Sequence, residues 1–453
     1  MAYTGDRATV FQTIKIAPEA TAGTAPAAIA SYKKLAALGW SFSITPTVQT
    51  FRPAGQKYTT VTALNKEQTD MSLEGIPTYT EIVYPLSSVL TAATITAAGG
   101  TTGSASGSRD MGDDSTHWFF QPSAADADSP ISYTVYQGSV ARSHRASYTQ
   151  LTDFSIALNR NDTSLSGAAI GKAIEDDQHM PGNEFNTLVV DATGGTFTLT
   201  FGGATTGAIA YNATDAVLLA ALEALSTIPK GSIRVESTDT LTWTIEFGGS
   251  LGETDQTLTS SATNLTGGAG TAVITETLAG GAISSVGLSP LLSTAVCIYV
   301  FDAAQTSVNT ATNETTAYQL TGIMEAEWSV SSRYAPRWTL DCTTSSYSGM
   351  VEIEPTMQLR IRMEADAPGM DLLTDLRSGD TKFFRIRAHG GAIDDDAAQI
   401  YEFTLDFAGK MSEAGDLSDQ DGVFAIEWTF DGVPELTNGG PVEISVVNNV
   451  TSL

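Results

Sequence analysis

The sequence predicts a mainly β protein with a few short helices, and two observations support that class. The 453 residues are rich in glycine, alanine, threonine and serine but include only 23 lysines and arginines, which is typical of β proteins with many turns. Apolar and polar residues also alternate, which indicates strands with one face on a core and one in water. The clearest example is a long hairpin whose arms carry Met324, Ala326, Trp328 and Val330, then Met357, Leu359, Ile361 and Met363.

The first segment, residues 1–182, is expected to form one β domain with an N-terminal arm. A short strand is predicted at 9–14, and a second at 38–44 places Trp40, Phe42 and Ile44 on one face. The elements expected after it are a hairpin tip at 52–57, a return strand around 71–76, a helix at 78–90, a low-complexity loop at 91–108, and strands at 118–120, 131–136 and 148–158.

The segment 283–435 repeats this order, and residues 436–453 are expected to form a C-terminal extension. The strand 296–301 corresponds to 10–16, and Trp328 corresponds to Trp40. The further correspondences are 334–337 with 51–53, 371–377 with the short helix, 382–385 with 117–120, 401–407 with 131–136, and 423–430 with 154–158. This pattern predicts an internal duplication, although any two β-rich segments can align by chance.

Residues 183–282 form a different unit between the two copies. A helix is expected at 213–225, where Thr214 can cap it, and strands at 233–236, 241–247 and 272–277. Glycine pairs at 194–195 and 280–281 bracket the unit, as in a domain inserted into a surface loop. It contains no histidine or cysteine, so we expect a small β-sandwich without catalytic chemistry.

The formal charge of −28 argues against binding nucleic acid through phosphates, because that binding depends on lysine and arginine. The acidity can serve to repel DNA, or it can serve solubility alone. Cys297 and Cys342 are interpreted as buried small hydrophobes rather than a disulfide. Residues 1–15 lack a signal peptide, and no apolar run is long enough to span a membrane, so a soluble protein made in a cytoplasm is expected.

The sequence offers no catalytic site, and we expect no enzyme activity, no cofactor and no bound metal. The four histidines are scattered, and no serine lies in a G-x-S-x-G motif. The glycine-rich stretch 267–270 is interpreted as a turn. The acidic clusters 175–177 and 394–396 have two interpretations, solvated loops or a calcium or magnesium site.

Several stretches resemble major tail tube proteins of long-tailed, siphovirus-like bacteriophages. They are IAPEATAGTAPA at 16–27, the strand and hairpin at 38–75, the TYTEI stretch at 78–82 and RASYTQLTDFSIALNR at 145–160. The middle unit, with GGTFTLTFGG at 194–203 and AYNATDAVLLAALEAL at 210–225, is similar to an Ig-like module of actinobacteriophage virion proteins.

The resemblance implies a structural protein of the virion tail, assembled in the host cytoplasm. Rings of this chain would stack into a hollow tube that conducts DNA without binding it specifically, and the inserted domain would decorate the outside. Two copies of the fold per chain imply a trimer with pseudo-sixfold symmetry, and a single copy implies a hexamer. Other tail proteins, namely the tape measure, terminator and distal tail proteins, would be partners, and no membrane would be involved. The alternative is another phage structural protein, such as a tail terminator or a decoration protein.

The resemblance also suggests roles for charged residues. Basic loop tips with Arg52, Lys57, Arg333 and Arg337 would contact adjacent rings, or would be merely solvated. Carboxylates on barrel strands would face the lumen and repel DNA phosphates, although alternation alone does not give the face. The candidates are Glu67, Asp70, Glu74, Glu325, Glu327, Glu352 and Glu354.

Overall fold

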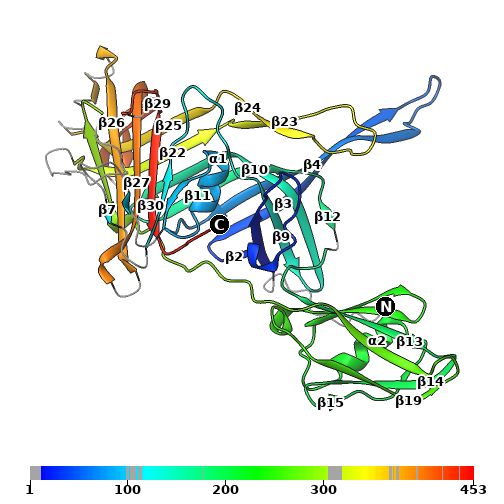
Figure 1. Cartoon of the computed structure of the whole chain (residues 1–453). Coiled ribbons are helices and arrows are strands. Elements are labelled where there is room, and N and C mark those ends of the chain that lie inside the picture. The colour runs from blue at the N-terminus through cyan, green and yellow to red at the C-terminus, as the bar shows by residue number, and fades with distance from the viewer. Residues whose placement is uncertain are drawn as a thin grey trace.

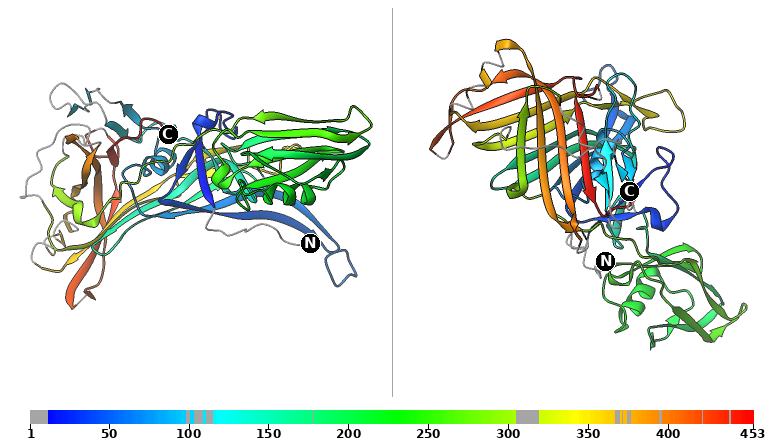
Figure 2. Two further views of the ribbon diagram at one scale, coloured as in Figure 1. Left: turned by 90° about the horizontal axis from the view of Figure 1, so that it is seen from below. Right: turned by 60° about the vertical axis from the view of Figure 1, so that its left-hand side comes forward.

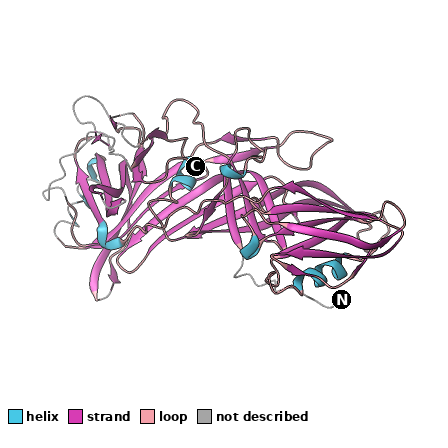
Figure 3. Cartoon of the chain, turned by 60° about the horizontal axis from the view of Figure 1, so that its bottom comes forward, coloured by secondary structure: helices cyan, strands magenta, loops and turns pink. Residues whose placement is uncertain are grey.

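The computed structural model describes residues 12–97, 101–102, 109–110, 115–176, 178–304, 319–366, 370, 372–373, 377–393, 396–420, 422–437 and 439–453. Within these ranges the protein is mainly β, which confirms the predicted class (Figures 1 and 3). The α-helices with described bounds are α1 (Val83–Val89) and α2 (Asp215–Glu223). The predicted strand at 9–14 lies mostly outside the described residues, and the strand observed there is β1 (Thr13–Pro18).

One antiparallel sheet runs through both segments that flank the middle unit. In spatial order its strands are β3 (Leu38–Phe51), β4 (Val61–Gly75), β11 (Thr163–Gly171), β10 (Arg142–Asn159), β22 (Ile323–Ser331), β25 (Thr356–Glu364), β29 (Val423–Gly432) and β27 (Asp396–Ala414). The two flanks meet where β10 pairs with β22, with Ile156 opposite Trp328. Figure 2 shows strands of both flanks side by side in this sheet.

The pairing order of the first flank recurs in the second. In the first flank, β10 also pairs with β9 (Tyr133–Ser139) and β12 (Glu175–Asp176), and β9 pairs with β1. In the second, β27 also pairs with β26 (Thr381–Ile393) and β30 (Val442–Asn448), and β26 pairs with β21 (Val296–Phe301). Likewise β3–β4, β4–β11 and β10–β11 have their counterparts in β22–β25, β25–β29 and β27–β29.

The strand correspondence differs in part from the predicted one. Residues 382–385 were predicted to correspond to 117–120. By strand pairing, 382–385 lie in β26 and correspond to β9. Residues 117–120 lie instead in β8 (Thr116–Phe120), which pairs with β30 and with β5 (Thr94–Thr96). β30 falls in the predicted extension 436–453 and is instead a fully buried strand of the fold. The predicted correspondence between the two flanks relied on aromatic residues. Because aromatic residues occur in many strands, it did not give the pairing order.

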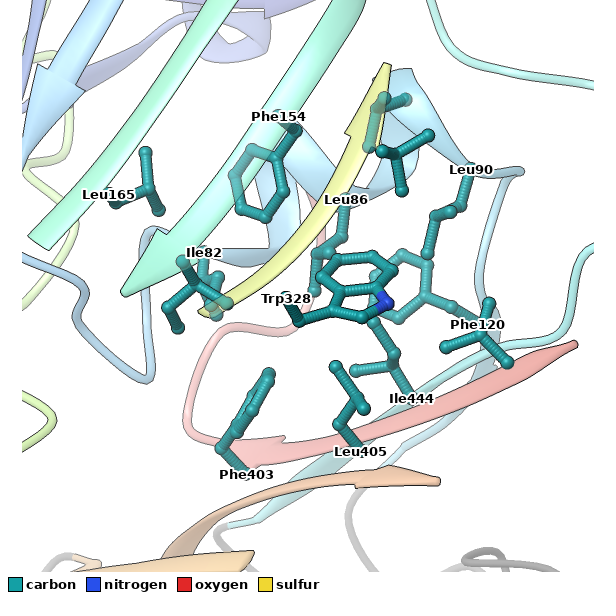
Figure 4. Close-up of a cluster of buried hydrophobic side chains, with 14 of the residues drawn as sticks. Ile82, Leu86, Leu90, Phe120, Phe154, Leu165, Trp328, Phe403, Leu405 and Ile444 are labelled. Atoms are coloured by element: carbon teal, nitrogen blue, oxygen red, sulfur yellow. The ribbon is translucent and has the colours of Figure 1, made fainter. Parts of the chain in front are cut away.

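Both flanks contribute to one apolar core on one face of the main sheet. Helix α1 is wholly buried against this face. Around Trp328, which is 1% exposed, lie Leu86 of α1, Phe120 of the first flank and Leu405 of the second (Figure 4). Each large buried side chain contributes roughly 1.5–3 kcal/mol by leaving water. Because the side chains come from both flanks, neither flank can bury its apolar face alone.

The middle unit has its own sheets and its own core. One sheet has the order β17 (Ile233–Asp239), β18 (Thr242–Phe247), β13 (Glu184–Asp191) and β20 (Thr271–Leu278). The other joins β14 (Gly194–Phe201) to β15 (Ala204–Thr205), β16 (Ile209–Ala210) and β19 (Leu258–Thr266). Leu218 and Leu222 of α2 pack into the core between them. The Nζ of Lys15 lies 2.9 Å from Glu253 Oε1 and ties this unit to β1.

Short elements complete the described chain. They are β2 (Lys33–Leu35), β6 (Thr101–Thr102), β7 (Arg109–Asp110), β23 (Tyr334–Arg337), β24 (Gly349–Glu352), β28 (Ser418–Gln420) and the 3-10 turns Ile29–Ser31, Gly249–Leu251 and Ser293–Ala295. The described residues of the second predicted helix (371–377), which are 372–373 and 377, are helical, as are 370 and 378 beside it. Cys297 is half-buried and Cys342 is exposed, so the expectation that both are buried was wrong, since Cys342 lies in the loop after β23.

A buried carboxylate shapes the turn that leads into β3. Glu81 is 0% exposed, and its two oxygens accept the backbone N–H groups of Ala36, Ala37 and Leu38 at 2.7–3.2 Å. Burial raises the pKa of Glu81, while these hydrogen bonds oppose the shift. The arrangement needs an acceptor at both oxygen positions.

We therefore expect Glu81→Gln to destabilise the fold by about 1–3 kcal/mol, because its NH₂ would face backbone donors and leave them unsatisfied. Urea unfolding followed by fluorescence measures this loss. Glu74→Gln, an exposed carboxylate on β4, is the matched control and should change stability by under about 0.5 kcal/mol. Equal effects of the two substitutions would contradict the assigned role.

Candidate assembly surface

The main sheet has a polar face opposite the core, lined by hydroxyl and charged side chains. On β4, Leu73 is buried, while its neighbours Ser72 and Glu74 are exposed. Serine hydroxyls pair across strands on this face, with Ser41 Oγ to Ser72 Oγ at 2.5 Å and Ser155 Oγ to Ser166 Oγ at 2.9 Å. The face is therefore broad, polar and rich in small side chains.

The structure separates the candidate carboxylates into two groups. Asp70, Glu74, Glu325 and Glu327 alternate with buried residues and share the polar face. Glu67 is an even number of residues from Met71 and Leu73, which are buried. Its side chain therefore lies on their side of β4, opposite the polar face. Glu352 and Glu354 lie on or after β24, which pairs with β23 in a separate two-stranded sheet. The seven candidates therefore do not form one set: four lie on the polar face, Glu67 lies on the other side of β4, and Glu352 and Glu354 lie on a hairpin outside the main sheet.

Two arginines on the same face did not enter the candidate set. Arg360 and Arg362 on β25 alternate with Leu359 and Ile361, which are buried. Arg362 lies 2.7 Å from Glu427 Oε2 and 3.6 Å from Glu325 Oε2. The alternation of β25 contained this signal, and the face consequently carries partly compensated charge rather than carboxylates alone.

The main sheet is open at both ends within the described part of the chain. Residues 38–42 of β3 pair only with β4, and residues 411–414 of β27 pair only with β29. Among the described strand pairs, none joins these two strands to each other. Unpaired strand edges are templates for pairing with another chain.

Apolar residues at these open edges are less covered than their counterparts inside the chain. At the β10–β22 joint, Phe154 and Val330 are opposite each other and are 2% and 1% exposed. Their counterparts by pairing order are Met411 and Phe42, which are both half-buried. The edges thus resemble a joint whose partner is absent from one chain.

The β3–β4 hairpin extends beyond the body as an arm, with its tip at residues 52–60 (Figure 1). Val48 and Leu64 form a cross-strand pair on it and are 52% and 50% exposed. The tip carries Arg52 and Lys57, both exposed, and Tyr58, which is 72% exposed. Such a row of exposed apolar residues on one hairpin is typical of a contact surface.

The second predicted basic tip is different, because Arg333 is buried. It is 2% exposed, and its guanidinium pairs with Asp128 and lies 3.0 Å from Glu352 Oε1. Burial raises the pKa of Asp128, although Arg333 acts in the opposite direction. The prediction of a contact role for Arg333 was wrong, since its partner lies 205 positions earlier and no local pattern reveals the pair. Arg337 is exposed, as a contact role requires.

The described residues contain no group of three or more His, Cys, Asp or Glu side chains that could hold a metal ion. The cluster at 175–177 is occupied in part by ion pairs, with Glu175 contacting Arg145 and Asp176 contacting Arg142. Asp177, Asp394 and Asp395 lie outside the described residues. Among the helices that are described, none is long and apolar enough to cross a membrane.

Comparisons with known proteins give a partial likeness to a solved structure. No family model matches the chain, and no curated protein matches it. A solved chain from Mycobacterium phage Patience is 20% identical, over 35% of this chain and 58% of that chain, with a TM-score of 0.18. This chain is therefore similar over part of its length to a phage protein, and a TM-score this low supports no argument about fold or mechanism.

If Arg333 is structural, Arg333→Met should destabilise the protein by about 3–5 kcal/mol, because Asp128 would be left buried without its partner. The free energy of unfolding in urea measures the effect. Arg337→Met, four residues on and exposed, should change it by less than about 0.5 kcal/mol. A loss below about 1 kcal/mol at Arg333, the size of a surface ion pair, would contradict the buried-pair interpretation.

Proposed function

We propose that this chain is a structural protein of a phage tail. Three copies join edge to edge into a closed ring, and rings stack into the hollow tube through which DNA leaves the virion. The observation that carries the proposal is the joint between β10 and β22, whose two halves recur at opposite, open ends of the same sheet. The duplicated pairing order makes an inter-chain joint of the same kind possible.

The internal joint gives the register of the joint between chains. Matching strands by pairing order places Met411 opposite Phe42 of the next chain, as Phe154 lies opposite Val330. Beyond the bulge between Met411 and Glu413, Ala414 is placed opposite Trp40, as Ile156 lies opposite Trp328. Closing the ring removes the exposed edges, which would otherwise allow indiscriminate aggregation. An interface of this head-to-tail kind forms a ring when its rotation closes.

The polar face suits the lumen of such a ring. Glu74, Glu325 and Glu327 would repel the phosphates of passing DNA, and the many serine hydroxyls offer no charge for phosphates to bind. Arg362 is held between two carboxylates, which limits its attraction for phosphate. The duplex would pass without specific binding, and no catalytic step is needed.

The remaining surfaces fit contacts outside the ring. The β3–β4 arm would reach an adjacent ring through its apolar pairs and through Arg52 and Lys57, with Arg337 nearby as a further basic contact. The middle unit would decorate the tube exterior. Tape measure, terminator and distal tail proteins would be partners in a virion tail assembled in the host cytoplasm, with no membrane involved.

Negative-stain electron microscopy of the purified protein over a concentration series tests the proposal. Hollow tubes or stacked rings are expected. Closed rings that never stack, even with tape measure and distal tail proteins added, would favour the terminator alternative. A chain that remains monomeric under those conditions would contradict the proposal.

A lysine at the open edge should prevent ring closure. Phe42→Lys places a charge where Met411 of the preceding chain would cover it, and burying an unpaired charge costs several kcal/mol, on the order of a 100-fold or greater loss of association. Analytical ultracentrifugation measures the change. Val273→Lys, at a 51% exposed valine of the middle unit, is the matched control and should assemble normally. Unaltered assembly of Phe42→Lys would rule out this edge as the joint.

Shortening the arm should separate ring formation from stacking. Residues 49–63 can be replaced by an Asn-Gly turn, because Val48 and Leu64 are already paired and a two-residue turn closes such a hairpin. Rings should form and tubes should not, as scored by electron microscopy. The double variant Arg52→Gln, Lys57→Gln keeps the apolar arm and distinguishes its charge from its apolar contacts. Full-length tubes from the shortened chain would show that the arm is dispensable.

A further inference from the structure

Two exposed side chains continue the apolar face of the sheet beyond its covered core. Leu417 and Phe424, here called the apolar tip, are 60% and 71% exposed. They lie on the β28–β29 hairpin, directly after the open edge of β27. The register pairs Asp419 with Phe424, so Leu417 and Phe424 share the face of Ile426, which is buried in the core. Nothing in the described part of the chain covers them.

A second exposed apolar group lies at the opposite end of the sheet. Ile76, Leu288 and Leu292, here called the apolar ledge, are 54%, 60% and 56% exposed. Residues 287–292 run antiparallel to 76–80, because Thr78 bridges Pro290, and this register places Ile76 opposite Leu292. The same segment begins beside β2, where Val286 N donates to Lys34 O at 3.1 Å. The ledge therefore borders the turn that enters β3.

We infer that the apolar tip of one chain docks on the apolar ledge of the next chain in the ring. The inference rests on the proposed edge pairing. Once Ala414 lies opposite Trp40, antiparallel continuation carries the turn between β27 and β28, residues 415–417, toward residues 37–38 of the next chain. Ala37 follows closely after Lys34, whose carbonyl oxygen accepts a hydrogen bond from Val286 N, and Val286 leads into the ledge. Tip and ledge thus lie at the same end of the proposed joint between chains.

The internal joint has a contact at the equivalent place. The turn after β10 lies against the start of the second flank, where Ser293 Oγ donates to Arg160 O at 3.2 Å and Arg160 borders the same cavity as residues 319–324. By the offset between Trp328 and Trp40, which is 328 − 40 = 288, residues 319–324 correspond to 31–36. The turn after β27 would therefore approach 31–36 of the next chain.

Charge favours the same orientation. The tip hairpin carries exposed Asp416 and Asp419 and no basic residue within its described residues 415–424. The region beside the ledge carries Lys33, whose Nζ lies 3.2 Å from Ser284 Oγ, whereas Lys34 is already paired with Glu253 at 2.5 Å. Opposite charges at the rim would guide the two ends together, while the apolar contact excludes water.

Disulfide trapping tests the contact in the full chain. In a background of Cys297→Ser and Cys342→Ser, the pair Leu417→Cys with Leu288→Cys should give covalently closed trimers on a non-reducing gel after mild oxidation. The control pair Leu417→Cys with Val273→Cys should remain mostly monomeric. Mixing the two single variants should give covalent dimers only, since each chain then carries one half of the contact.

A second variant measures the contribution of the tip. Phe424→Ser should weaken ring association by roughly 10- to 100-fold, because a buried phenylalanine contributes about 1.5–3 kcal/mol. Val273→Ser is its control. Three results together would overturn the docking but not the ring. The wild-type chain would form rings, the cysteine pair would be trapped only at the control level, and Phe424→Ser would assemble normally. A wild-type chain that forms no rings would overturn both.

Discussion

The pairing of β10 with β22 is the interaction on which the rest of this structure depends. It joins two flanks through residues far apart in the chain, as the pair Ile156–Trp328, with 328 − 156 = 172, shows. The fusion lets both flanks cover helix α1 and Trp328 with a common core. It also leaves β3 and the end of β27 as open edges with half-covered apolar residues. In the proposed ring, another chain supplies the strands that these edges lack.

The same constraint explains the two faces of the sheet. The apolar face must be covered within the chain, so it carries the tryptophans and contacts α1. The other face carries serines and carboxylates and needs no cover, so it is free to line a conduit. Arg360 and Arg362 make this face less acidic than the overall charge of −28 implies. Repulsion of DNA would then come from the whole protein as much as from the lining residues.

Period-two alternation was enough to predict the class and the strands around Trp40 and Trp328, while the bracketing glycine pairs predicted the separate middle unit. It also indicated that Asp70, Glu74, Glu325 and Glu327 lie on the polar side of their strands. It did not show which face of the sheet that side forms. The pairing order, the burial of Arg333 against Asp128 and the role of β30 could not be predicted. Each depends on partners far away in the chain, and alternation reports only the local division between core and solvent.

Native mass spectrometry of the assembled particle tests the central claim most directly. The account predicts a closed ring with the mass of three 47.5 kDa chains, because each chain supplies two equivalent halves of one sheet. A ring of six chains would mean that the internal joint is not repeated between chains and would contradict the account.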